Sequence, residues 1–218
     1  MVKSMTGFGK GEAALRNKKI TVEIRPYVVN FMDWEQADGA KYESPTYTCP
    51  VLSPDAATVY VNTGNKVSNL YAFDVQTGKQ KWTFRPTDNG DTQAESKSMA
   101  AVNPVSGDIY YGTSAGGQFY AVKPDGTLRW KFSKCGSMNP APPAASADGT
   151  VVYIVDAKGN LYALDAETGT ERWGAPYAAG SCGYGLLVNG GEVVVGAKTA
   201  VHFVSAADGT KIDAVTVS

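Results

Sequence analysis

One pattern occurs three times along this chain and constrains its fold more than any other feature. It consists of an aromatic residue, an alanine, an apolar residue, a glycine turn and a tryptophan. The copies are LYAFDVQTGKQKW (70–82), FYAVKPDGTLRW (119–130) and LYALDAETGTERW (161–173). A weaker fourth copy, VHFVSAADGTKIDAV (201–215), has His202 at the tyrosine position and Asp213 at the tryptophan position. A period of about 40 to 50 residues indicates a repeated supersecondary unit.

Each copy is preceded by short apolar segments with strand-like composition. The segments directly before the copies are TVYVNTG (58–64), DIYYGTS (108–114), VVYIVDA (151–157) and EVVVGAK (192–198). Turns such as QTG, PDG, ETG and ADG supply a glycine that takes positive φ, as short hairpin loops require. Every unit is therefore predicted to be a meander of four short antiparallel strands.

The last strand of each unit alternates aromatic and polar residues. Trp82 and Phe84 alternate with Lys81 and Thr83, which places both aromatic side chains on one face of the sheet. A small sheet cannot bury such a face alone and needs a similar neighbour. The prediction is an all-β protein: a β-propeller of about four four-stranded antiparallel blades. We expect the repeat tryptophans to dock each blade on its neighbour; they are Trp82, Trp130 and Trp173.

Composition narrows the classes of function. The net charge of −1 gives no general attraction to nucleic acid, and no apolar run approaches the roughly 20 residues of a membrane helix. No signal peptide is expected at the N-terminus, so either the protein stays in the cytoplasm or a leader is missing from this sequence, and the compartment stays open. The three cysteines, Cys49, Cys135 and Cys182, are too few for a disulfide framework, and their redox state is also left open.

The stretch VYIVDAKGN followed by LYALDAETGTERW resembles the repeat of the quinoprotein-like, or PQQ-like, propellers, and this resemblance covers residues 46–217. The resemblance implies a propeller from a mostly periplasmic or extracytoplasmic family, which includes quinone-dependent dehydrogenases, outer-membrane assembly scaffolds and sensor domains. Those dehydrogenases carry two adjacent cysteines and a calcium site, and this chain has no Cys-Cys pair. We therefore expect a non-enzymatic module that binds a protein or a glycan, and no cofactor. A PQQ-dependent oxidoreductase, or its inactive remnant, is the alternative.

The N-terminal residues differ from the repeats. Residues 1–25 carry six basic and two acidic residues, and SMTGFGKGEA (4–13) with VEIR (22–25) resembles the start of the YicC family, bacterial proteins associated with endoribonuclease activity. RNA processing is thus a further alternative. We predict a leader or junction segment at 1–25 and repeats at 46–218. Residues 26–45 are predicted to be a linker with a stray outer strand near Trp34, which lies 48 residues before Trp82.

Candidate sites follow from where the predicted strands begin. Met138, Asn139, Cys182 and Tyr184 fall near the start of innermost strands, so we expect them at the propeller rim or channel mouth, where a partner binds. The loop with Asp88, Asp91 and Glu95 offers three carboxylates, for which calcium is the minority interpretation. His202 is expected to serve in packing or to lie at the surface. The number of blades also leaves three assemblies open: a small closed ring, an open arc, or a ring that two chains complete through open blade faces.

Overall fold

The computed structural model describes residues 49–63, 68–91, 98–114, 117–137, 141–180 and 182–217, without the side chains of 182–184. The chain divides into two compact units, Met1–Asn30 and Phe31–Ser218, and all described residues belong to the second. The predicted leader, the linker and Trp34 lie outside the described residues, so the predicted domain boundaries stay predictions. In the described part, no helix is long and apolar enough to cross a membrane.

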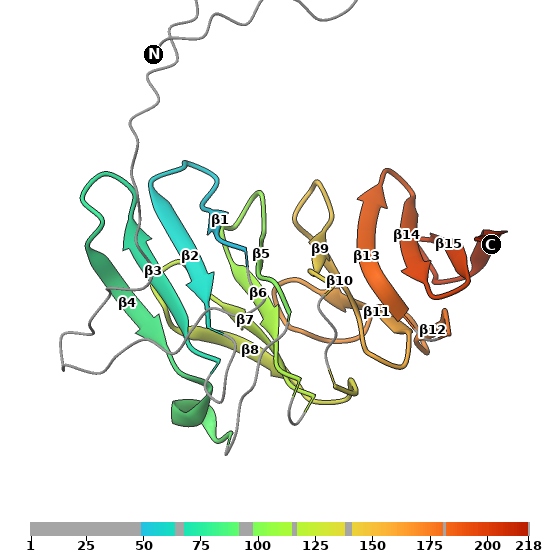
Figure 1. Ribbon diagram of the computed structural model, residues 1–218, viewed down its shortest axis with the longest axis horizontal. Coiled ribbons are helices and arrows are strands. Elements are labelled where there is room, and N and C mark those ends of the chain that lie inside the picture. Colours follow the sequence, from blue (N-terminus) through green and yellow to red (C-terminus); the bar gives the residue numbers. More distant parts are fainter. Residues whose placement is uncertain are drawn as a thin grey trace, which may run out of the picture. The chain divides into compact units, whose positions relative to one another are not determined.

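The described residues form four antiparallel sheets of four strands each, which confirms the predicted fold class (Figure 1). The first sheet contains β1 (Val51–Leu52), β2 (Thr58–Asn62), β3 (Leu70–Asp74) and β4 (Gln80–Phe84). The second contains β5 (Ala101–Val102), β6 (Ile109–Gly112), β7 (Phe119–Val122) and β8 (Leu128–Phe132). The third contains β9 (Ala144–Ala145), β10 (Val151–Val155), β11 (Asn160–Asp165) and β12 (Tyr177–Ala178). The fourth contains β13 (Cys182–Asn189), β14 (Glu192–Ala197), β15 (Ala200–Ser205) and β16 (Lys211–Thr216).

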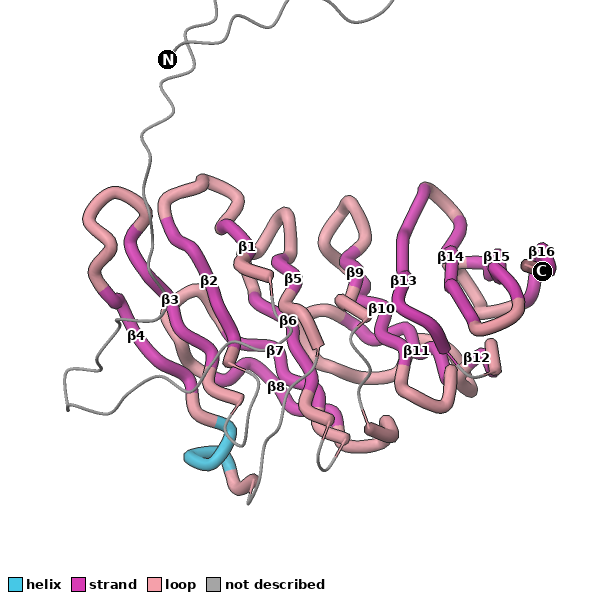
Figure 2. Tube along the Cα trace, in the orientation of Figure 1, coloured by secondary structure: helices cyan, strands magenta, loops and turns pink. Residues whose placement is uncertain are grey.

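Each sheet is a meander in which strands that follow one another in the chain pair with each other. Turn glycines with positive φ join them, as at Gly78 (φ 68°) and Gly169 (φ 72°). Apart from these strands, the described residues contain one short 3-10 helix, η2 (Pro86–Asn89), after the first sheet (Figure 2). Two ends of each sheet can be distinguished. At one end, which we call the first-turn end, turns join the first strand to the second and the third strand to the fourth.

The register supports the alignment of the repeats. Trp82 pairs with Ala72 and Trp130 pairs with Ala121, and in the fourth sheet Asp213 occupies the corresponding place opposite Phe203. The fourth repeat therefore carries an acid where the first two carry an indole.

The third sheet departs from the sequence prediction. Trp173 was expected in its last strand, but that strand is β12, which begins four residues later at Tyr177. Only an isolated bridge between Leu164 and Glu171 continues the pairing near Trp173. The sequence WGAPY explains the interruption, because Pro176 has no N–H to donate and Gly174 weakens a strand.

Three apolar clusters fill the spaces between consecutive sheets. The cluster between the first and second sheets includes Tyr60, Phe84 and Tyr120, and each of the other two likewise combines side chains from two sheets. The sheets follow one another in chain order, and the first and fourth lie at opposite ends of the row (Figure 1). Each inner sheet is thus buried on both faces. Burial of large apolar side chains, worth about 1.5–3 kcal/mol each, is the main force that joins the sheets.

Candidate functional site

The repeat tryptophan of each of the first three sheets contacts a glycine turn of the next sheet. The indole N–H groups donate to backbone carbonyls, from Trp82 to Pro124 (2.9 Å), from Trp130 to Ala166 (2.9 Å) and from Trp173 to Ala206 (3.3 Å). The rings lie against Gly126, Gly169 and Gly209, where an added Cβ would come within 2.6–2.7 Å of a ring atom. This contact fixes how closely consecutive sheets approach at the first-turn end.

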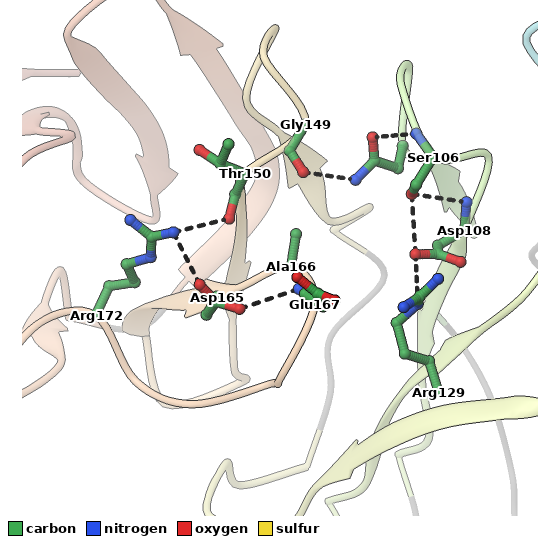
Figure 3. A pocket seen from close by; sticks show the side chains of 10 residues that line it. Ser106, Asp108, Arg129, Gly149, Thr150, Asp165, Ala166, Glu167 and Arg172 are labelled. Carbon is green, nitrogen blue, oxygen red and sulfur yellow. Dashed lines mark hydrogen bonds and ion pairs between the residues drawn. The ribbon is translucent and has the colours of Figure 1, made fainter.

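A cleft of about 350 Å³ lies at the first-turn end between the second and third sheets (Figure 3). We call it the interblade cleft. The second sheet lines it with Asn103, Ser106, Asp108 and Arg129. The third sheet lines it with Gly149, Thr150, Asp165, Ala166, Glu167 and Arg172. The same Ala166 carbonyl accepts the indole N–H of Trp130, so the tryptophan contact directly positions one wall.

The wall from the second sheet contains a buried carboxylate. Asp108 is 2% exposed, and its Oδ2 lies 2.7 Å from Nε of Arg129 and accepts a hydrogen bond from Oγ of Ser106 (2.9 Å). Its Oδ1 has no hydrogen-bond partner among the described residues. A buried charge is tolerated only when it is paired, so Arg129 compensates the desolvation of Asp108.

The wall from the third sheet holds a second ion pair. Nη2 of Arg172 lies 2.8 Å from Oδ2 of Asp165 and also donates to the carbonyl of Thr150 (3.3 Å). Desolvation raises the pKa of Asp165, but hydrogen bonds from Thr168 and Arg172 outweigh it and hold the pKa below its ordinary value of 3.8. Asp165 is therefore ionised at neutral pH, and Figure 3 shows the two ion pairs on opposite sides of the cleft.

Asn103 ties the two walls together. Its Nδ2 donates to the hydroxyl of Tyr110 (3.0 Å) and to the carbonyl of Gly149 (2.9 Å), while its Oδ1 accepts from two N–H groups of its own turn. A Cβ at Gly149 would lie 2.5 Å from Oδ1 of Asn103, so the turn of the third sheet approaches as closely as it can. The fully buried amide sets the width of the cleft.

The interblade cleft was not predicted from the sequence, although one feature of the repeated motif indicates some of the residues that line it. The residue before each repeat tryptophan is basic, and it reaches back to the start of the second strand of its own sheet. Lys81 donates to the hydroxyl of Thr58 (2.8 Å), just as Arg129 contacts Asp108 and Arg172 contacts the carbonyl of Thr150. Only the second sheet places a carboxylate there.

None of the described residues that line this cleft is a predicted rim residue. Met138 and Asn139 lie outside the described residues, as do the side chains of Cys182 and Tyr184. Cys182 begins β13. Residues 138–140 fall between β8 and β9 in the chain, and β8 finishes at the end of its sheet that lies opposite to the first-turn end. A rim site formed by these four residues stays a prediction.

The other candidate residues have ordinary surroundings in the described part. Asp91 lies 3.4 Å from Nζ of Lys131, Asp88 is exposed in η2, and Glu95 lies outside the described residues, so calcium binding stays a prediction. His202 shares a hydrogen bond of 2.9 Å with the hydroxyl of Tyr177, which links the third and fourth sheets.

The two cysteines with described side chains are both free. Cys49 is exposed, whereas Cys135 is buried. Burial, together with the nearby charge of Asp156, raises the pKa of the Cys135 thiol to about 12. Its thiol donates to the carbonyl of Gly117 at 3.0 Å, so Cys135 takes part in the packing between the second and third sheets.

Comparison with known proteins places this architecture. The family model described as outer membrane protein assembly factor BamB matches residues 29–140 and 120–212. The serine/threonine-protein kinase AfsK of Streptomyces griseus is 30% identical over 177 residues, which are 78% of this chain and 21% of the kinase. The outer membrane protein assembly factor BamB of Xanthomonas campestris pv. campestris is 29% identical over 150 residues, 67% of this chain and 36% of that protein.

A solved structure shows the same fold. The crystal structure of BamB from Moraxella catarrhalis matches with a TM-score of 0.55 and 17% identity, over 78% of this chain and 50% of that one. The chain thus spans half or less of the length of each of these relatives. Since the family model covers well over half of the sequence and the four sheets repeat the same meander, the chain belongs to the family of the outer membrane protein assembly factor BamB, built from PQQ-like β-propeller repeats.

Proposed function

We propose that this chain is a non-enzymatic scaffold that binds a protein partner through the interblade cleft. The observation that carries the proposal is the pair of opposed ion pairs, Asp108–Arg129 and Asp165–Arg172, on the two walls of one cleft. The membership of the BamB family supports it, because the name of that family describes an assembly factor rather than an enzyme.

The chemistry of the cleft favours a peptide segment that carries charges of both signs. Three carboxylates and two guanidinium groups line it, and the exposed Glu167 lies at its margin. Opposite charges arranged in this way select a partner with the complementary pattern and exclude partners with one sign only. Arginine in particular forms two parallel hydrogen bonds with a carboxylate, so Arg172 suits an acidic side chain of the partner.

The names of the relatives suggest where such a partner belongs. Two of them are outer membrane protein assembly factors. We propose that this chain also acts in assembling outer membrane proteins, and that its partner is a protein component of that process. The predicted glycan partner is the competing class.

A photocrosslinking experiment tests the proposal. A benzophenone amino acid replaces Glu167 at the margin of the cleft, and a matched variant carries it at Lys158, an exposed residue in the turn between β10 and β11, at the other end of the third sheet. We expect irradiation of the native host to give one discrete protein adduct from position 167 and none from 158. Adding Arg172→Gln, which removes a charge but no packed core side chain, should abolish that adduct.

Two results would contradict the proposal. Identical adducts from both positions would indicate non-specific contact. An adduct that persists in the Arg172→Gln variant would show that binding does not depend on the charged walls of the cleft. Binding of the purified chain to immobilised polysaccharide, with no protein adduct at position 167, would favour the glycan class instead.

A further inference from the structure

We propose that the partner segment bound in the interblade cleft also carries an aliphatic side chain, which packs on an apolar lip beside the cleft. The lip consists of three exposed residues, Pro104, Val105 and Ala147. This inference rests on the proposed function. It adds a second feature by which the partner is recognised, namely an aliphatic residue next to its acidic one.

The lip belongs to the two turns that form the mouth of the cleft. Pro104 and Val105 separate two residues that line the wall from the second sheet. Ala147 stands two residues before Gly149, which lines the wall from the third sheet (Figure 3). A Cβ on Gly149 would lie 2.8 Å from Cβ of Val105, so the valine lies against the turn of the opposite wall. One surface therefore runs from the charged cleft onto the lip.

Val105 is an unusual residue for a turn of this kind. Its side chain is 69% exposed, the highest value among the exposed large hydrophobic side chains of the described residues. Short turns favour Gly, Pro, Asn, Asp and Ser. The equivalent turns of the other three sheets, at 53–57, 146–150 and 190–191, contain no apolar residue larger than proline. Among these four turns, only the one from the second sheet, at the cleft, exposes a valine.

The valine is held in place before any partner binds. Oδ1 of Asn103 accepts hydrogen bonds from the N–H groups of Val105 (2.9 Å) and Ser106 (3.1 Å), and the N–H of Gly107 donates to the Asn103 carbonyl (3.0 Å). Asn103 itself is fully buried. Because the backbone of this turn is already ordered, a partner loses little free energy in fixing it, and more of the hydrophobic gain appears as affinity.

The chemistry of the lip and the cleft together favours a protein segment as the occupant. Covering aliphatic surface is favourable in proportion to the apolar area removed from water. An aliphatic side chain therefore gains more on the lip than a sugar ring covered with hydroxyl groups does. Arg172 in the adjoining cleft attracts a carboxylate. We therefore expect a segment in which Val, Ile or Leu lies beside Asp or Glu.

Photocrosslinking from the lip tests this inference. A benzophenone amino acid replaces Ala147, and its adducts in the native host are compared with those from position 167. We expect both positions to give an adduct with the same partner protein, because one bound segment covers the lip and the margin of the cleft.

A matched pair of substitutions tests the role of the valine. Val105→Thr keeps the shape of the side chain but replaces a methyl group with a hydroxyl, and it should lower both adduct yields about tenfold. Leu52→Thr, at a 53% exposed residue of the first sheet that does not line the cleft, should leave both yields unchanged. Both replaced side chains are exposed, so neither change should alter the unfolding temperature.

The outcomes separate this inference from the proposed function. An adduct from position 167 but none from 147, or yields that Val105→Thr leaves unchanged, would overturn the lip contact and leave the cleft as the binding site. An adduct from position 147 alone, or from neither position, would overturn both. An adduct with twice the mass of this chain would identify a second copy as the occupant and would overturn the inference of a separate partner.

Discussion

At the scale of single residues, three glycines of the repeat are required for space as well as for their backbone conformation. Gly126, Gly169 and Gly209 all have positive φ, which many turns share, but each also lies directly under an indole ring. The sequence shows the tryptophan and the turn glycine as parts of one motif. In the structure, each tryptophan instead contacts the glycine of the next motif, a pairing that period and composition alone do not reveal.

The first prediction separates these two requirements. Gly126→Ala places a Cβ 2.7 Å from Cδ2 of Trp82, whereas Gly90→Ala meets open space at nearly the same φ, 86° against 87°. We expect Gly90→Ala to cost about 1 kcal/mol of unfolding free energy. Gly126→Ala should cost about 2–4 kcal/mol, because the ring must also move out of its packed position. Urea unfolding measures both, and equal losses would show that the indole contact adds nothing.

At the scale of elements, the turns between the third and fourth strands share one stabilising device. The carboxylates of Asp74 and Asp165 accept hydrogen bonds from the backbone N–H and the hydroxyl of a threonine three residues later. Asp125 and Asp208 accept from Thr127 and Thr210, two residues later. These bonds favour the ionised carboxylate and hold its pKa below 3.8.

This device predicts how stability depends on pH. Because the folded-state pKa values are lowered, their stabilisation is present above the unfolded-state value of 3.8 and is lost as the pH falls through the folded-state values. We expect the urea midpoint to be flat from pH 7 to 5 and to decline below pH 4. A variant with Asn at Asp74, Asp125 and Asp208 keeps a side-chain acceptor but does not titrate, so its decline should be shallower. An identical acid decline in both proteins would assign the effect to other carboxylates.

The same scale shows where prediction from the sequence stopped. The repeated motif located every sheet, because glycine turns and strand periodicity are local properties. The last strand of the third sheet was misplaced, since Pro176 shifts pairing from Trp173 to Tyr177. The interblade cleft was missed for a different reason: Asp108 and Asp165 face each other only after two sheets have docked.

At the scale of the whole molecule, the two faces of the fourth sheet differ. Val195 and Val204 face the third sheet and are completely buried, whereas Leu187 and Val215 on the other face are more than half exposed. The repeat period predicted the number of sheets. The predicted role of the open face as a contact between two chains stays a prediction.

Paired substitutions compare these faces. Val195→Thr leaves a hydroxyl without a partner in an apolar interface and should cost about 1–3 kcal/mol of unfolding free energy. Val215→Thr should change it by less than about 0.5 kcal/mol, because that side chain is already in solvent. Thermal unfolding at two protein concentrations distinguishes them. A loss from Val215→Thr that appears only at the higher concentration would instead reveal self-association through this face.

The direction of the tryptophan contact has a consequence for how such a chain can lengthen in evolution. The second and third sheets each offer an indole on one side and a receiving glycine on the other, as the second sheet does with Trp130 and Gly126. A duplicated segment of one repeat therefore carries both halves of a matching joint, and it can be inserted beside its parent without any new complementary surface.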